Sequence, residues 1–395
     1  MQYDFENINR RFGIGSQKWQ EMKDNPLVDE KVIPFSVADM ELKLAPEITE
    51  GLKSFIDNNV LGYAGSNKKY RQTVCKWLEE QHNFKVEEQW LIETHSVVNA
   101  FFTAVKSFTH KGDGVMLFTP VYYPMYKAIE INGRTLVEVP LINNQTKYDI
   151  DWDLFEEKAK LPTTKMLILC SPHNPCGRIW TRDELIKLSE ICLANDVFVV
   201  ADEIHSDLIM PGYEHISYGT ISKEALANAM ICTAPSKTFN LAGMQISNIF
   251  IANEQYRNLF KLEQATDADF ACSILSYEAC RLAYEQGKEW LKGVISLVDT
   301  NRQLITDFMQ EYFPQIKITP MQATYLLWFD CRAFGLSNEE LESKNRQEAC
   351  LYFDEGYIFG KAGSGFERWN LACPTKYIKW GLERFYKAYK EFAIK

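Results

Sequence analysis

The sequence lacks the patterns that mark many metal and redox sites. Its ten cysteines include no CxxC pair, and its six histidines show no HxxxH or HExxH spacing. Neither a zinc site nor a dithiol redox motif is therefore indicated, and we predict that the protein holds no metal. Several cysteines lie in apolar runs, such as the run that ends at Cys170, so we expect buried free thiols.

An excess of basic residues and long apolar runs are also missing. The chain has 43 Lys and Arg against 53 Asp and Glu, a formal net charge of -10, which leaves no basic stripe for a nucleic-acid backbone. Charged residues begin at the fourth position, and no later stretch reaches a membrane-spanning length of apolar residues. We therefore expect a cytoplasmic protein that binds neither nucleic acid nor membranes.

Short apolar runs alternate with helical patterns, and no repeat or flexible linker divides the chain. At 395 residues the chain can bury a large core and a smaller second one. The near-continuous hydrophobicity of the runs is typical of a parallel sheet covered on both faces. We predict an α/β fold with a large domain over 46–287, built on a mostly parallel central sheet, and a smaller α+β domain from 1–45 and 288–395 with an N-terminal arm. The predicted strands are 115–119, 166–170, 197–201, 230–233 and 246–251.

Helix starts can be predicted at two places. Apolar residues at helical spacing indicate a helix over 66–81, with Ser66 as its N-cap. Thr181 followed by Glu184 forms a capping-box pattern before another amphipathic helix. In the smaller domain the pattern predicts a long helix over 287–301, a strand over 325–329 and a final helix from residue 377.

Polar or aromatic side chains follow four of the predicted strands: Tyr122, Asn174, Asp202 and Lys237. In open α/β sheets ligands bind beyond the carboxyl ends of the strands, so these groups are expected at one edge. Lys237 could form an imine there. Asp202 ends an apolar strand, where a carboxylate is costly to bury without a cationic partner. A protonated pyridine nitrogen is such a partner, and its protonation makes the ring an electron sink.

The other two side chains suit the same ligand, because Tyr122 can stack on a ring and Asn174 can donate to its phenolic oxygen. Taken singly, the four could be a surface lysine, a helix-capping aspartate, a core aromatic and a turn residue. The segment 94–98 precedes a helix expected from Asn99, whose N-terminus could hold a phosphate, although many helices begin similarly. Together these residues indicate pyridoxal 5'-phosphate (PLP).

In this order the residues resemble fold-type I PLP enzymes of the aminotransferase class I and II superfamily across nearly the whole chain. The likeness is greatest to MalY/PatB-type cystathionine β-lyases and cysteine desulfhydrases. The matching phrases are VADM at 37–40, GY at 62–63, CSPHNPCGR at 170–178, DEIHSDL at 202–208, APSKTFNLAG at 234–243 and GSGFERWNLA at 363–372. The resemblance implies a homodimer with shared active sites. It also implies a carbon–sulfur β-lyase that converts cystathionine, cysteine or related S-conjugates to pyruvate, ammonia and a thiol or hydrogen sulfide by α,β-elimination.

The resemblance also gives roles to single residues. It implies that Lys237 carries PLP as a Schiff base and then acts as the base, and that Asp202 pairs with the pyridine nitrogen. Tyr122 would stack on the ring and contact the substrate, while Asn174 would contact the ring oxygen. The phosphate would be held by Ser236, Ser96 and Val97, with Tyr63 contributed by the neighbouring subunit.

The substrate carboxylate would be bound by Arg368, with a backbone N–H of Ala38 nearby. An arginine suits this task because its planar guanidinium meets a carboxylate with two charge-assisted hydrogen bonds. The alternative for Arg368 is an ordinary surface ion pair.

Several positions depart from the family pattern. His205 stands where many aminotransferases have a tyrosine that bonds the ring oxygen, and we expect instead a packed histidine with satisfied hydrogen bonds. Gln245 takes the place of a phosphate-binding arginine, which favours the lyase branch. Ser96 replaces a glycine and Glu41-Leu42 replaces an Asp-Phe pair, so the phosphate loop and the substrate entrance are expected to differ locally.

Two alternatives stay open. An aminotransferase would share the cofactor and the early steps but would yield an oxo acid. A regulatory protein that binds a transcription factor is the alternative from another class, since a fold does not fix a function. Intact Lys237, Asp202 and Arg368 weigh against a purely binding role.

Overall fold

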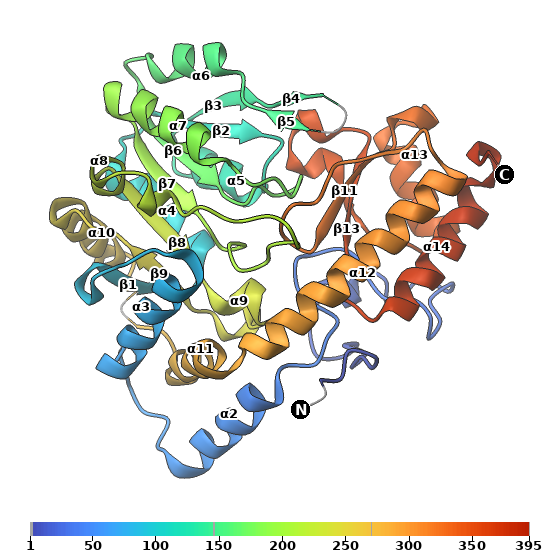
Figure 1. The fold of residues 1–395 in the computed structure, drawn as a ribbon, viewed down its shortest axis with the longest axis horizontal. Helices are drawn as coiled ribbons and strands as arrows, with labels where there is room; N and C mark the ends of the chain where they lie inside the picture. The colour runs from blue at the N-terminus through green and yellow to red at the C-terminus, as the bar shows by residue number, and fades with distance from the viewer. Residues whose placement is uncertain (1–2, 145–146, 270, 395) are drawn as a thin grey trace.

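A seven-stranded sheet organises the larger of two lobes in the computed structural model, which describes residues 3–144, 147–269 and 271–394 (Figure 1). β9 is antiparallel to both of its neighbours, and the other pairs are parallel. This confirms the α/β fold with a mostly parallel sheet. In spatial order the strands are β1 (Leu91–Thr94), β9 (Ser247–Phe250), β8 (Ala229–Thr233), β7 (Phe198–Asp202), β6 (Thr164–Cys170), β2 (Gly114–Thr119) and β3 (Thr135–Pro140).

The five strands predicted from apolar runs are all present, within two residues at each end. They lie inside the sheet, where both faces are covered and most residues are apolar or small. The prediction missed β1 and β3, which form the two edges of the sheet. β3 alternates exposed and buried residues over most of its length, and β1 is only four residues long, so neither gives a continuous apolar run.

Helices cover both faces of the sheet, because alternate side chains of each strand point to opposite sides. Val115 and Leu117 of β2 belong to one buried cluster, whereas Met116 and Phe118 belong to the other. The first cluster includes residues of α4 (Val97–Phe108), α5 (Pro124–Ile131) and α10 (Glu254–Thr266). The second includes residues of α3 (Lys68–His82), α6 (Trp152–Ala159), α7 (Arg182–Ala194), α8 (Lys223–Ala227) and α11 (Ile274–Gln286).

Local capping fixes where these helices begin. Thr181 and Glu184 form the predicted capping box at the start of α7. The predicted cap of α3 at Ser66 is wrong, because Asn67 is the N-cap and its side chain accepts from the backbone N–H of Tyr70 at 2.9 Å. The helix expected from Asn99 begins two residues earlier, at Val97, because Ser96 caps it.

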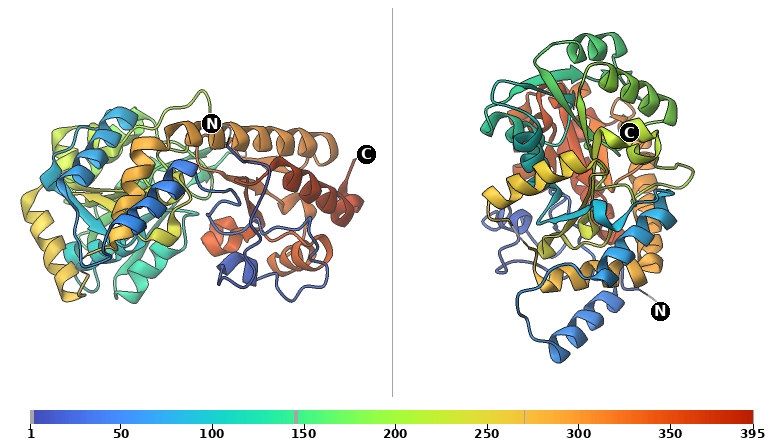
Figure 2. Two further views of the ribbon diagram at one scale, coloured as in Figure 1. Left: turned by 90° about the horizontal axis from the view of Figure 1, so that it is seen from below. Right: turned by 90° about the vertical axis from the view of Figure 1, so that its left-hand side faces the viewer.

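The second lobe has the predicted α+β character. Its four-stranded antiparallel sheet has the order β10 (Lys317–Ile318), β11 (Leu326–Asp330), β13 (Phe366–Asn370) and β12 (Asp354–Glu355), with α13 (Asn338–Ser343) and α14 (Thr375–Tyr389). The long helix α12 (Lys288–Tyr312) runs from the large lobe into this one (Figures 1 and 2). It continues past its predicted end at Asn301, whose buried amide donates to the backbone oxygens of Leu371 and Cys373 at 2.9 Å each.

The N-terminal arm, with α1 (Gln17–Gln20), runs beside the second lobe before α2 (Pro46–Asn58) begins (Figure 1). The backbone of Phe35 bonds to Tyr352 at 2.8 Å and to Asn370 at 2.9 Å. These contacts agree with grouping residues 1–45 with the smaller domain, and the boundaries 46–287 stay a prediction. The remaining regular pair is β4 (Ile142–Asn143) with β5 (Tyr148–Asp149).

The thiols are as the sequence predicts. All ten cysteines are unpaired, and nine of them are buried. None of the helices in the described ranges is long and apolar enough to cross a membrane.

Candidate active site

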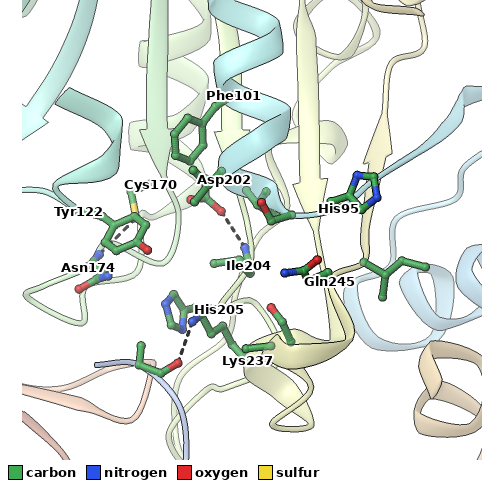
Figure 3. A pocket seen from close by; sticks show the side chains of 17 residues that line it. His95, Phe101, Tyr122, Cys170, Asn174, Asp202, Ile204, His205, Lys237 and Gln245 are labelled. Carbon is green, nitrogen blue, oxygen red and sulfur yellow. Dashed lines mark hydrogen bonds between the residues drawn. The ribbon is translucent and has the colours of Figure 1, made fainter. Parts of the chain in front are cut away.

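One pocket lies at the carboxyl edge of the central sheet, and eight of the predicted site residues line it. Figure 3 shows the side chains that follow β2, β6, β7 and β8 facing the same space. The strands place them there because parallel neighbours end at the same edge. The eight are Ala38, Ser96, Val97, Tyr122, Asn174, Asp202, Ser236 and Lys237.

Lys237 lies on the short helix α9 (Pro235–Thr238), directly after β8. Its Nζ donates to the carbonyl oxygen of Ala38 at 2.7 Å (Figure 3). The hydroxyl of Tyr325 donates to the same oxygen at 2.9 Å. Removal from water lowers the pKa of Lys237 to about 8, although the negative charges of Asp39 and Asp202 act in the opposite direction. A larger fraction of neutral amine is then present near neutral pH, and the neutral amine is the nucleophilic and basic form.

Asp202 is the last residue of β7 and is only 4% exposed. One of its oxygens accepts from the backbone N–H of Ile204 at 3.2 Å, and a turn rather than a helix follows, so it does not cap a helix. No cationic side chain within the described ranges forms an ion pair with it, and burial raises its pKa to about 7. A buried carboxyl without an ion-pair partner fits a ligand that brings its own positive charge, such as the protonated pyridine nitrogen of PLP.

The N-terminus of α4 forms another wall of the pocket. Ser96 caps this helix by accepting from the backbone N–H of Asn99 at 3.0 Å. The first N–H groups of a helix have no partner within it, and the helix dipole favours negative charge there. With the hydroxyl of Ser236 and the amide of Gln245 on the same pocket, these groups fit a phosphate. The residues present therefore suit both ends of PLP.

Arg368 on β13 does not line the pocket itself, but from the second lobe it contacts Asn174, which does. It is 2% exposed, so the alternative of a surface ion pair is wrong. Its guanidinium donates to Oδ1 of Asn174 at 2.8 Å and pairs with Asp354, while its buried Nε has no partner. Because Oδ1 of Asn174 is turned toward Arg368, the amide nitrogen of Asn174 stays free to donate to a ring oxygen.

Tyr122 and Tyr63 differ in their placement. Tyr122 lies half-buried on the pocket, beside Tyr123, with ring centroids 5.3 Å apart. Tyr63 lies fully exposed in the segment between α2 and α3, and it does not line the pocket of its own chain. Its predicted phosphate contact therefore needs a second subunit.

His205 departs from the sequence prediction in one respect. The ring is packed, 3% exposed and 6.1 Å from the ring of Tyr325, but its Nδ1 has no hydrogen-bond partner, so the expectation of a satisfied histidine is wrong. It lines the pocket beside Lys237 (Figure 3). Burial, helped by the charges of Lys237 and Arg368, holds its pKa well below the usual range, so the imidazole is neutral.

The sequence prediction missed a buried charge cluster in the N-terminal arm. Nζ of Lys18, which is 1% exposed, lies 2.8 Å from Asp39 and 3.0 Å from Glu41, and Arg11 pairs with both carboxylates. The cluster holds the residues next to Ala38. The sequence does not reveal this cluster, because charged residues make up 24% of the chain and nothing in their spacing sets these four apart from the others.

The same segment is held from the second lobe. Val37 has φ of +53°, which is unfavourable for a β-branched residue. Its N–H donates to Asp354 at 2.9 Å, and the amide of Asn370 donates to the carbonyl oxygens of Val37 and Asp39 at 2.7 Å each. Strain of this kind persists only where surrounding contacts fix the backbone, and here they fix the carbonyl that meets Lys237.

A family comparison agrees with this geometry. Residues 30–385 match the model of the aminotransferase class I and II family, and the chain belongs to that family. It is a PLP-dependent enzyme of fold type I. It is 35% identical to cystathionine beta-lyase PatB of Bacillus subtilis, over 96% of this chain and 98% of that protein. It is 29% identical to protein MalY of Escherichia coli, over 96% and 97%. The structure matches that of cystalysin from Treponema denticola, which contains PLP, with a TM-score of 0.97 and 43% identity over 99% of this chain and 100% of that one.

Proposed function

We propose that this protein is a PLP-dependent carbon–sulfur β-lyase acting on cystathionine, cysteine or related S-conjugates of cysteine. The overall reaction adds one water to R–S–CH2–CH(NH3+)–COO⁻ and yields R–SH, pyruvate and ammonium. The observation that carries the proposal is a pocket lined by Lys237, Asp202 and Asn174, with Arg368 bonded to Asn174, in a chain 35% identical to a cystathionine β-lyase.

Bound PLP supplies an electron sink that lets a proton leave the α-carbon of an amino acid. Asp202 would keep the proton on the pyridine nitrogen, since its buried carboxylate forms no ion pair with any side chain that the structure describes. Arg368 would bind the substrate carboxylate, with its unpartnered Nε among the available donors. Nζ of Lys237, with its lowered pKa, would take the α-proton.

A thiolate leaving group favours elimination over transamination. Once Lys237 has taken the α-proton, the carbon–sulfur bond of the substrate would break readily, because a thiolate is a far better leaving group than hydroxide. Gln245, in place of an arginine at the phosphate end, also favours the lyase branch of the family. An aminotransferase is the alternative that experiment must separate.

Incubation of the PLP-loaded protein with cystathionine, without any oxo acid, separates the two. We expect pyruvate and free thiol to accumulate together through many turnovers. A transaminase would stop consuming cystathionine after one equivalent per active site, and would resume only when an oxo acid is added. That outcome would replace the lyase proposal with the aminotransferase alternative.

We also propose that the enzyme is a homodimer in which Tyr63 of each subunit reaches the phosphate site of the other. The segment that carries Tyr63 exposes Val60 at 89% and Leu61 at 53% and projects from the large lobe (Figure 1). Such exposed apolar side chains favour contact with a second protein surface. A cytoplasmic location stays a prediction.

Mixed dimers test the shared site. Tyr63→Ala should weaken PLP binding, and Lys237→Ala should be inactive, each as a homodimer. Refolding the two variants together should restore activity, because one of the two sites then holds both native residues. A monomer in light scattering, or no gain of activity on mixing, would contradict the shared site.

A further inference from the structure

Another buried carboxylate, that of Asp207, lies on the loop that follows Asp202. The side chain of Asp207 is 7% exposed and does not line the pocket that holds Lys237 and Asp202. Its contacts nevertheless join the parts of the chain that carry those two residues.

Asp207 accepts three hydrogen bonds from two other elements. Its Oδ2 accepts from the hydroxyl of Thr238 on α9, at 2.7 Å. Its Oδ1 lies 3.1 Å from the indole Nε1 of Trp77 and 2.7 Å from Nε2 of His82, both on α3. Burying a carboxylate costs several kcal/mol unless its partners are well placed, so this arrangement holds the three segments in one relation to one another.

Thr238 makes this contact matter for the reaction, because it follows Lys237 in the chain. α9 is only four residues long, and the Thr238 side chain is fully buried. A helix this short has few hydrogen bonds of its own. The backbone N–H of Phe239 donates to the carbonyl oxygen of Pro235 at 2.9 Å, and that of Leu241 donates to Ser236 at 3.0 Å. The hydrogen bond from the Thr238 hydroxyl to Asp207 connects this short helix to the loop after β7.

We propose that Asp207 is a positioning residue for the reaction, which through the Thr238 hydroxyl fixes Lys237 relative to Asp202. The inference rests on the proposed function, in which these two residues act at opposite ends of one cofactor. A displacement of about 1 Å at a reacting group can cost up to about a hundredfold in rate, so a small shift of the turn is enough to matter.

His82 and Trp77 extend the tie to α3. Burial alone would lower the pKa of His82, but its hydrogen bond and charge interaction with Asp207 raise it above the ordinary value. Other groups near the His82 ring include Ser206, with Oγ at 3.5 Å, the His215 ring at 5.7 Å and the carboxylate of Glu203. α3 follows the exposed segment of Tyr63, so the same carboxylate joins that segment to the site.

Isosteric variants test the inference in the PLP-loaded enzyme. Thr238→Val keeps the shape and removes the hydroxyl, Thr238→Ser keeps the hydroxyl, and Asp207→Asn keeps the shape and removes the charge. Thr164→Val is the matched control, because Thr164 is also buried and its hydroxyl donates to a backbone oxygen, of Lys158 at 2.8 Å, at the far end of β6. PLP content, the visible absorbance of the lysine-bound cofactor, the unfolding temperature, kcat and KM are measured for each.

We expect Thr238→Val to bind one PLP per chain and keep KM within about twofold, while kcat falls about tenfold. Thr238→Ser should retain most of the wild-type kcat. The double variant Thr238→Val with Asp207→Asn should be no slower than the slower of the two single variants, because both substitutions act on the same hydrogen bond between Thr238 and Asp207. Thr164→Val should lose stability and not kcat.

Wild-type kcat in loaded Thr238→Val, or additive losses in the double variant, would overturn the inference. Should Thr238→Val fail to fold, Asp207→Asn with the Thr238→Ser comparison decides the same point. Failure of the proposed function would be seen in a different protein, the wild type, which would then carry no lysine-bound cofactor or release no thiol.

Discussion

The carbonyl oxygen of Ala38 lies 2.7 Å from Nζ of Lys237, although the two residues are 199 positions apart in the sequence. The contact joins the N-terminal arm to the pocket of the large lobe. Ala38 is presented by a segment held at Val37 by Asp354 and Asn370, and at Asp39 by Lys18 and Arg11. Residues from the arm and from both lobes therefore determine where the amine of Lys237 lies.

The Lys18 cluster can be tested by removing its buried cation. Lys18→Met should lower the free energy of unfolding by about 3–5 kcal/mol, because Glu41 then stays buried with less compensation. Urea unfolding measures this loss. Adding Glu41→Gln to Lys18→Met should recover part of it, and a single variant as stable as the wild type would show that the cluster contributes nothing.

Asp202 should matter far more for rate than for binding of PLP. Asp202→Ala is expected to retain the cofactor and to lose about 10²–10³-fold in kcat and in kcat/KM together, because it removes an interaction that strengthens in the transition state. Steady-state kinetics with cystathionine check this. Asp153→Ala, on the exposed first turn of α6, serves as a control. Near-normal kcat in Asp202→Ala would contradict the pairing with the ring nitrogen.

Arg368→Lys tests the carboxylate site while keeping a positive charge. A lysine cannot make the two parallel hydrogen bonds of a guanidinium, so KM should rise about tenfold or more while PLP stays bound. The same variant should lose less affinity for a cysteine analogue in which the carboxylate is an amide. Equal losses for both ligands would place the carboxylate elsewhere.

Stability should fall in mild acid through His173. This ring is fully buried, with Nε2 2.8 Å from the carbonyl oxygen of Pro120, and burial lowers its pKa to about 4. Below its unfolded pKa of about 6.5 the unfolded chain binds a proton that the folded chain does not, so stability decreases as the pH falls toward 4. Between pH 7 and pH 5 this group alone costs about 2 kcal/mol.

Urea unfolding of the wild type and of His173→Gln at the two pH values isolates that contribution. The variant is less stable at pH 7, but its loss between pH 7 and pH 5 should be smaller by about 2 kcal/mol. Equal losses in the two proteins would show that His173 is not responsible.

The sequence predicts best what depends on local pattern. The inner strands are continuous apolar runs, and the groups that follow them must meet at one edge, so Tyr122, Asn174, Asp202 and Lys237 could be placed together in advance. The edge strand β3 could not be recognised, because solvent on one side breaks up its apolar pattern. The cap predicted at Ser66 lies one residue before the true cap, Asn67, because serine and asparagine cap helices about equally well and the sequence pattern does not separate the two.

The parts that could not be predicted depend on contacts distant in the chain. Nothing near Arg368 in the sequence indicates that Asp354 and Asn174 will share its guanidinium. His205 looks like a packed core residue, and only the structure reveals a ring nitrogen without a partner. The tie from Asp207 to Thr238 spans 31 positions and follows from the pairing of β7 with β8.

Chemical reduction of the PLP-loaded protein with borohydride tests most directly whether Lys237 carries the cofactor. Reduction should fix one PLP per chain, and peptide mapping should find it on Lys237, whose pKa is lowered and whose Nζ faces the pocket. Lys237→Ala should fold, bind PLP without fixing it there, and release no thiol from cystathionine. A label on any other lysine of the wild-type protein, or thiol release by Lys237→Ala at the wild-type rate, would contradict the account.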